Sequence, residues 1–137
     1  MWRFEAGRPP RFRRSARRFD AGGVLDPLRL GMFEVAQSQL HAWGADAVQA
    51  RLRALTTAFD DALDTSGLGA WKTPGHASHL CGVRPPPAAF AAVASALQAA
   101  GITCTARRGV LRIAPHLHVS TADIARCVAV MAAARSG

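Results

Sequence analysis

The feature that most constrains the fold is a short hairpin pattern that leads directly into a helix start. "ITCTAR" (102–107) is rich in β-branched residues, which favour strands, and Arg108-Gly109 is typical of a tight turn before the return strand "VLRIAP" (110–115). Ser120 with Asp123 then forms a capping-box pattern. Apolar residues recur at helical spacing behind it, at Ile124, Cys127, Val128 and Met131. A hairpin followed by an amphipathic helix predicts a small antiparallel layer with a helix packed on it.

The chain upstream of this hairpin predicts three helices and one more short strand. Asp26-Pro27 is typical of a helix start, and the helix that follows spans about 17 residues before Gly44. A second helix begins near Ala45-Asp46 and carries an apolar stripe of Val48, Leu52, Leu55, Phe59 and Leu63. "SHLCGVR" (78–84) predicts a strand, and an alanine-rich helix over 87–100 ends at Gly101. We therefore expect an α+β fold, about three strands covered by helices, over residues 26–137.

Residues 1–25 predict an extended, arginine-rich arm in front of this domain. The first 18 residues hold seven arginines and one acid, Glu5, which accounts for +6 of the net charge of +8. Four aromatic residues are interleaved with them: Trp2, Phe4, Phe12 and Phe19. Such a mixture suits phosphate contact with base stacking, so a nucleic-acid or acidic-surface binding module is an alternative function. The remaining 119 residues are nearly neutral and carry no recognised binding motif. We therefore do not expect nucleic acid to be the main partner.

Composition also bounds the compartment. The three cysteines, Cys81, Cys104 and Cys127, are odd in number and form no CxxC, which argues against a disulfide scaffold and fits a reducing cytoplasm. No apolar run approaches the roughly 18 residues of a membrane span. The first residues lack the apolar core of a secretory signal. We expect a cytoplasmic protein with no membrane partner.

Two further groups of residues invite a chemical role. His76, His79 and Cys81 could meet His116 and His118 at a zinc ion if residues 79–84 pair with 110–115, but the spacing matches no standard zinc motif, so we expect no metal. Cys104 could supply a nucleophilic thiolate. Strand alternation instead places Cys104 inside a strand, and Cys127 lies on the apolar face of the last helix, so we expect both in the core.

Arg112 stands between Leu111 and Ile113 in the predicted return strand. Alternation allows its side chain to lie on a solvated sheet face while both neighbours are buried. A guanidinium also suits a carboxylate ligand, which it binds with two parallel hydrogen bonds. The residues alone leave both interpretations open.

Two blocks of the chain resemble one family. "ARRFDAGGVLDPLRLGMFEVAQSQLHAWGADAVQARLRAL" (16–55) and "HLCGVR…GITCTARRGVLRIAPHLHVSTADIARCV" (79–128) resemble the C-terminal part of class V, fold-type I enzymes that use pyridoxal 5'-phosphate. This family of aminotransferase-like enzymes includes kynureninases, cysteine desulfurases and isopenicillin-N-epimerase-like proteins. The resemblance covers nearly the whole chain and implies the small C-terminal domain of such an enzyme.

The resemblance also implies roles for single residues. Arg112 stands where the family's arginine binds the α-carboxylate of an amino-acid substrate, and His116 stands at the family's "PH" position beside that cleft. The cofactor's Schiff-base lysine, its aspartate and its phosphate donors belong to the family's large domain, upstream of these blocks. The only lysine here is Lys72, outside the family's lysine position. We therefore expect a chain that holds no pyridoxal phosphate and is inactive by itself.

The same resemblance bears on parentage and partners. The family's catalytic-cysteine loop has no counterpart here, which favours a kynureninase-like or epimerase- or lyase-like parent over a desulfurase. The chain looks like the last third of an enzyme: a truncated gene product, a pseudogene remnant or one half of a split protein. Because class V enzymes are dimers, we expect either a homodimer or a separate large-domain chain as partner.

Overall fold

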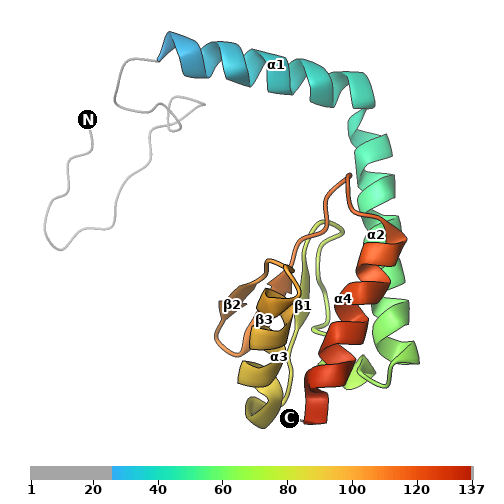
Figure 1. Ribbon diagram of the computed structural model, residues 1–137. Coiled ribbons are helices and arrows are strands. Elements are labelled where there is room, and N and C mark those ends of the chain that lie inside the picture. Colours follow the sequence, from blue (N-terminus) through green and yellow to red (C-terminus); the bar gives the residue numbers. More distant parts are fainter. Residues whose placement is uncertain (1–25, 137) are drawn as a thin grey trace, which may run out of the picture. The chain divides into compact units, whose positions relative to one another are not determined.

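The computed structural model describes residues 26–136, and these divide between two units with a boundary between Leu40 and His41. Helix α1 (Pro27–Trp43, Figure 1) belongs mostly to the first unit. Its start is as predicted, because the Asp26 carboxylate accepts a hydrogen bond of 3.0 Å from the Leu28 N–H. It ends before Gly44, whose φ of 79° suits glycine. None of its residues is buried, although it carries seven exposed large hydrophobic residues: Leu28, Leu30, Met32, Phe33, Val35, Leu40 and Trp43.

The second unit begins with helix α2 (Ala45–Thr65), whose predicted stripe forms one side of the core. Leu55, Phe59 and Leu63 are fully buried. The buried hydroxyl of Thr56 is satisfied within the helix, where it donates to the carbonyl oxygens of Leu52 at 3.2 Å and Arg53 at 3.0 Å. A short 3₁₀ turn, η2 (Gly69–Trp71), follows α2 and places Trp71 against the core. The sequence pattern does not predict this turn.

The sheet has three antiparallel strands in the order β1-β3-β2. Strand β3 (Val110–Ile113) is central and pairs with β1 (Cys81–Val83) and with β2 (Thr105–Arg107). The turn between β2 and β3 is the predicted Arg108-Gly109, with φ values of 51° and 74° as a type I′ hairpin requires. Residues 71–73 extend the sheet beyond β1. The Thr73 N–H donates to Gly82 O at 3.0 Å and the Arg84 N–H to Trp71 O at 2.7 Å.

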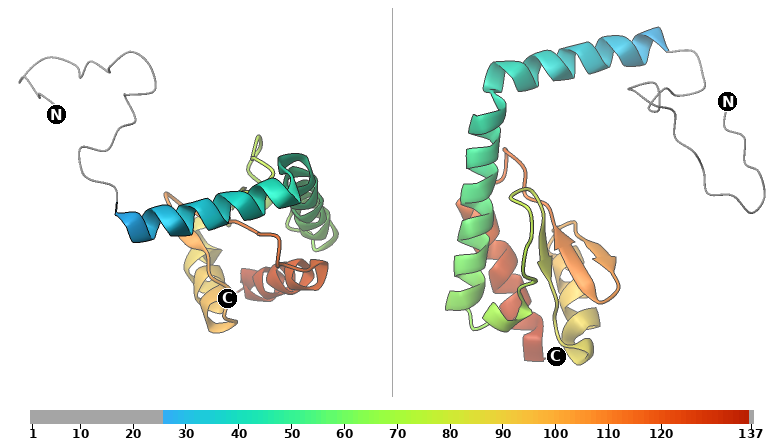
Figure 2. Two further views of the ribbon diagram at one scale, coloured as in Figure 1. Left: turned by 90° about the horizontal axis from the view of Figure 1, so that it is seen from above. Right: turned by 180° about the vertical axis from the view of Figure 1, so that it is seen from behind.

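Helices α3 (Pro87–Ala99) and α4 (Thr121–Ala133) complete the second unit, followed by the 3₁₀ turn η3 (Ala134–Ser136). The predicted capping box of α4 is confirmed. Asp123 N–H donates to Ser120 Oγ at 3.1 Å, and Ser120 N–H donates to Asp123 Oδ2 at 2.9 Å. Helix α4 packs against α2 and α3, as the two views of Figure 2 show. The helices share one core with Leu111, Val83 and Cys81 of the sheet.

The predicted α+β architecture with three strands is confirmed, but the strands are shorter than the sequence suggests. Residues 102–104 precede β2 because Ile102 N–H donates to Leu97 O at 2.9 Å, which caps the end of α3. Leu80 lies before β1 because its N–H closes a turn onto Ala77 O at 3.1 Å. In both places a local hydrogen bond engages the backbone N–H that a longer strand would use for pairing.

Candidate functional site

The site is built around Arg112, in the middle of the central strand β3. Its neighbours Leu111 and Ile113 are 0% and 8% exposed, whereas Arg112 is exposed. Successive side chains of a strand point to opposite faces, so Arg112 points away from the core that the helices share with Leu111. Its direct partners are Gly82 on β1 and Thr105 on β2. Arg112 therefore lies on the exposed face of the sheet, on its central strand and not on an edge strand.

Six residues share this side of the sheet, and we call them the arginine face. Arg112 and Val110 lie on it from β3, and Thr105 and Arg107 lie opposite them on β2. A Cβ built on Gly82 would contact the Thr73 hydroxyl and lie 3.2 Å from Val110 Cγ1, so those two side chains lie on the same side. The arginine face consists of Thr73, Gly82, Thr105, Arg107, Val110 and Arg112.

The residues that pair with Arg112 on the two neighbouring strands are small. Gly82 has no side chain, and Thr73 Oγ1 lies over that position, where it donates to Gly82 O at 2.9 Å. Thr105 on the other flank is small and exposed. Arg112 is thus a long donor side chain between two short neighbours, on the same side of the sheet as the hydroxyl groups of Thr73 and Thr105.

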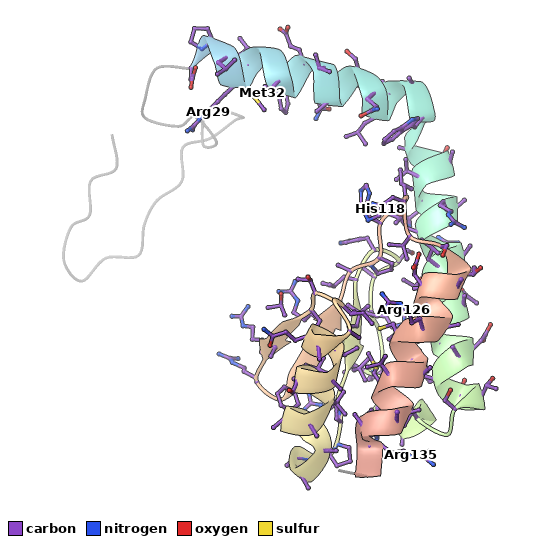
Figure 3. The ribbon with its side chains drawn as sticks, viewed as in Figure 1. Arg29, Met32, His118, Arg126 and Arg135 are labelled. Carbon is purple, nitrogen blue, oxygen red and sulfur yellow. The ribbon has the colours of Figure 1, made fainter. Side chains whose placement is uncertain are left out.

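The arginines of the second unit fall into two groups, and Arg107 and Arg112 share theirs with Arg53, Arg84 and Arg108, which are also exposed without a hydrogen bond or ion pair among the described residues. Three arginines elsewhere hold the fold together by donating to backbone carbonyls: Arg51 to Val119 at 2.8 Å, Arg126 to Ala100 at 3.0 Å, and Arg135 to Ser66 at 3.2 Å (Figure 3 labels the last two). Within residues 26–136, Arg107 and Arg112 form no such hydrogen bond and no ion pair. Their donors are therefore free for an anion as far as this part of the chain is concerned.

The acidic residues of the second unit are mostly engaged elsewhere. Asp60 Oδ2 lies 2.9 Å from His76 Nε2, and Asp64 Oδ2 lies 2.6 Å from Lys72 Nζ. Ser120, through its hydroxyl and then its backbone N–H, holds the pKa of the Asp123 carboxyl below its usual range. No ion pair among the described residues neutralises the arginine face, which keeps its positive charge.

His116, the second predicted substrate-binding residue, lies in the loop between β3 and α4. It is exposed, and its ring centroid is 5.9 Å from that of His118, with the planes inclined by 37°. The N-terminus of α4 is capped by Ser120 and Asp123. His116 lies in this loop three residues beyond Ile113, and no described hydrogen bond joins it to Arg112.

Lys72 bears on whether this chain could hold pyridoxal phosphate. Its Nζ forms the 2.6 Å contact with Asp64, and that hydrogen bond raises the pKa of the Lys72 ammonium. A Schiff base forms through the neutral amine, which a raised pKa disfavours. Because Lys72 is also the only lysine of the sequence, the residues present do not fit this cofactor.

The cysteines are placed partly as expected. Cys127 and Cys81 are buried, and desolvation raises the pKa of the Cys127 thiol to about 11 and that of Cys81 to about 12. Cys104 corrects the prediction, because it lies in the loop before β2 rather than in a strand and is only half-buried. Partial burial still raises the pKa of its thiol. Thiolate chemistry is disfavoured at all three positions.

The zinc alternative depended on pairing between residues 79–84 and 110–115. Those segments do pair, as β1 and β3. However, His76 is bonded to Asp60, and over residues 26–136 no three metal-ligating side chains come together. Strand pairing alone does not bring these histidines into one site.

Comparisons with protein-family models, with curated proteins and with solved structures find no significant match to the chain. The arginine-rich arm (1–25) lies outside the described residues. In the part of the chain that the structure describes, no helix combines the length and apolar character needed to cross a membrane.

Proposed function

We propose that this chain is the small C-terminal domain of a class V, fold-type I enzyme and that its arginine face contributes the carboxylate-binding group of an amino-acid site. The observation that carries the proposal is the placement of Arg112. It stands at the centre of the sheet, on the side away from the helices, between Gly82 and Thr105. The sequence resemblance supports the same role from an independent direction.

The physical case for Arg112 is one of rigidity and availability. Strands on both sides fix the backbone at this position, so the guanidinium starts from a defined point. It is always charged, and two of its N–H groups can meet both oxygens of a carboxylate. The backbone carbonyls that engage Arg51, Arg126 and Arg135 do not compete for it. An amino acid would thus be held by its α-carboxylate.

Catalysis would need groups that this chain does not supply. When bound, pyridoxal phosphate provides an aldehyde and an electron sink for the bonds at an amino acid's α-carbon. The ion-paired Lys72 is a poor anchor for it, so we assign the chain a substrate-positioning role and not the chemical step. The complete site would require a lysine beyond those that these 137 residues supply.

Helix α1 is the proposed surface for a partner chain. Leu28, Met32 and Val35 recur at i, i+4 and i+7, and all three are more than 60% exposed. An isolated helix of this length is marginal in water. We propose that α1 is covered by a large-domain chain in the complete enzyme and that the lone chain self-associates through it.

Nuclear magnetic resonance of the arginine Nε–Hε groups tests the carboxylate site. Adding acetate or L-alanine to the 137-residue protein should shift the Arg112 signal in a saturable way, whereas ethylamine should not. Arg112→Ala should weaken binding by about tenfold or more, since a hydrogen bond to a charged group contributes roughly 1.5–3 kcal/mol. Arg53→Gln removes an exposed arginine from α2 and serves as the control. Equal shifts of Arg53 and Arg112 would contradict the assignment.

Borohydride reduction tests the cofactor argument. The protein is mixed with pyridoxal phosphate at neutral pH, reduced and mapped by mass spectrometry. We expect Lys72 to remain largely unmodified because Asp64 holds its ammonium form. Stoichiometric trapping at Lys72 would show that this chain can anchor the cofactor and would overturn the inactive assignment.

Light scattering during size-exclusion chromatography tests the role of α1. Self-association should decrease in Met32→Lys, which places a charge within the stripe of Leu28, Met32 and Val35 (Figure 3 labels Met32), and should persist in Ser38→Lys, which adds the same charge outside that stripe. A clean monomer of the unmodified protein would contradict self-association.

A further inference from the structure

We infer that the arginine face binds a second carboxylate and that the substrate class is therefore an acidic amino acid. The inference rests on the proposed carboxylate role of Arg112 and adds Arg107 as the residue that selects the side chain. Arg107 is exposed on β2 and lies on the same side of the sheet as Arg112. Like Arg112, it has no hydrogen bond or ion pair within residues 26–136.

The register fixes how the two arginines are related. Arg112 is opposite Thr105, and Arg107 is opposite Val110, so the two are diagonal neighbours on adjacent strands. Diagonal neighbours of an antiparallel pair are roughly 7–8 Å apart. The two carboxyl carbons of an extended glutamate are roughly 5 Å apart, across four bonds of about 1.5 Å each. Two long guanidinium side chains can close that difference and hold one carboxylate each.

Electrostatics favours the same ligand. Two positive charges on neighbouring strands repel one another, and no described carboxylate lies between them to relieve this. A single carboxylate satisfies one guanidinium, whereas a dicarboxylate satisfies both. Val110 lies between them in the register and offers an apolar surface to the ligand's methylene groups.

The composition of the arginine face argues against a polymeric anion. None of its six residues is aromatic, so it offers no platform on which bases could stack. Arg107 and Arg112 form a diagonal pair on adjacent strands. A small dianion matches this arrangement better than a nucleic-acid strand does.

Paired titrations with L-glutamate and L-glutamine test the inference, because the two ligands differ in one carboxylate and share the α-amino acid group. At constant ionic strength, the 137-residue protein should bind glutamate at least about tenfold more tightly than glutamine, and the Arg107 Nε–Hε signal should shift only with glutamate. Arg107→Gln should remove this difference and leave glutamine binding unchanged. Arg53→Gln, with the same loss of charge, should keep it.

The possible outcomes separate the two proposals. Equal, Arg112-dependent affinity for glutamate and glutamine would overturn the acidic substrate class and leave the carboxylate role of Arg112 standing. No binding of either ligand would overturn both. If Arg53→Gln lowered the preference as much as Arg107→Gln does, bulk charge would explain it and the inference would fail. The ratio measured in the unmodified protein decides the matter even if Arg107→Gln does not fold.

Discussion

Adjacent substitutions on β3 should separate the structural side of the sheet from its functional side. Leu111 is completely buried. The side chain of its neighbour Arg112 is exposed and forms no hydrogen bond to another described residue. Leu111→Ala removes a core side chain and leaves a cavity, which costs about 2–5 kcal/mol. Arg112→Ala removes only a solvated side chain, so the free energy of unfolding should change by less than about 0.5 kcal/mol.

Urea unfolding followed by circular dichroism at 222 nm measures both values. With a slope of about 1–2 kcal/mol/M for a domain of this size, the Leu111→Ala midpoint should fall by roughly 2 M. The corresponding drop in Tm is on the order of 10–25 °C. Because total stability is often only about 5–15 kcal/mol, Leu111→Ala could be poorly folded at the start. Ile113→Val, a milder change on the same side, should then still cost about 0.5–1.5 kcal/mol.

The reasoning would be refuted by the reverse order. If Arg112→Ala lost more than about 1 kcal/mol, the side chain would be part of the folded structure and not held in reserve for a ligand. A small effect at both Leu111 and Ile113 would mean that the core does not lie on their side of β3. The expected result is a stable Arg112→Ala protein that has lost carboxylate binding, which would distinguish a binding role from a packing role.

Three further predictions concern the surroundings of the site. Ser120→Ala should lower the free energy of unfolding by about 1 kcal/mol because it removes the N-cap of α4. The folded pKa of Asp123 is depressed, so the stability that this carboxylate contributes is present above the ordinary carboxyl pKa and is lost as pH falls. In urea titrations from pH 7 to 3, the free energy of unfolding of the variant should therefore depend less on pH than that of the unmodified protein. Iodoacetamide at pH 8 should alkylate Cys104 before Cys81 and Cys127, whose buried thiols have pKa values of about 12 and 11. Equal alkylation rates of the three cysteines in the native protein, measured by mass spectrometry, would contradict the burial of Cys81 and Cys127. Gly82→Ala should lower the free energy of unfolding, measured thermally, by about 1–3 kcal/mol because its Cβ would meet Thr73 Oγ1. This loss should be smaller in a protein that also carries Thr73→Ala, and an equal loss would show that the contact is not the cause.

Elements with a strong local pattern could be predicted from the sequence. The stripe of α2, the Arg108-Gly109 turn and the Ser120–Asp123 capping box were all expected where the structure has them. Each depends on residues close together in the chain, where helical periodicity and turn chemistry operate. The same local rules left Arg112 with two interpretations. Alternation predicts that its side chain points to the other face of the sheet from Leu111, but it does not predict which face the helices cover.

What could not be predicted depends on contacts between distant residues. The ladder from residues 71–73 to 82–84 has no strand pattern of its own and forms because Thr73 and Trp71 meet Gly82 and Arg84. The ion pair of Lys72 with Asp64 follows from the η2 turn that brings them together. Pairing of β1 with β3 was considered only as a condition for zinc, whereas in the structure it places Gly82 beside Arg112 and Thr73 over Gly82.

The functional interpretation of the arginine face rests on how Arg107 and Arg112 are placed and not on their lack of partners. Arg51, Arg126 and Arg135 each donate to a backbone carbonyl far away in sequence, whereas Arg53, Arg84 and Arg108 are exposed without such a bond. Arg107 and Arg112 instead stand close together on the sheet, on the side away from the core, with no described partner. Keeping two like charges as diagonal neighbours costs free energy in the unliganded protein. An anion that bridges them would offset that cost, so removing one arginine should slightly stabilise the free domain while weakening the complex.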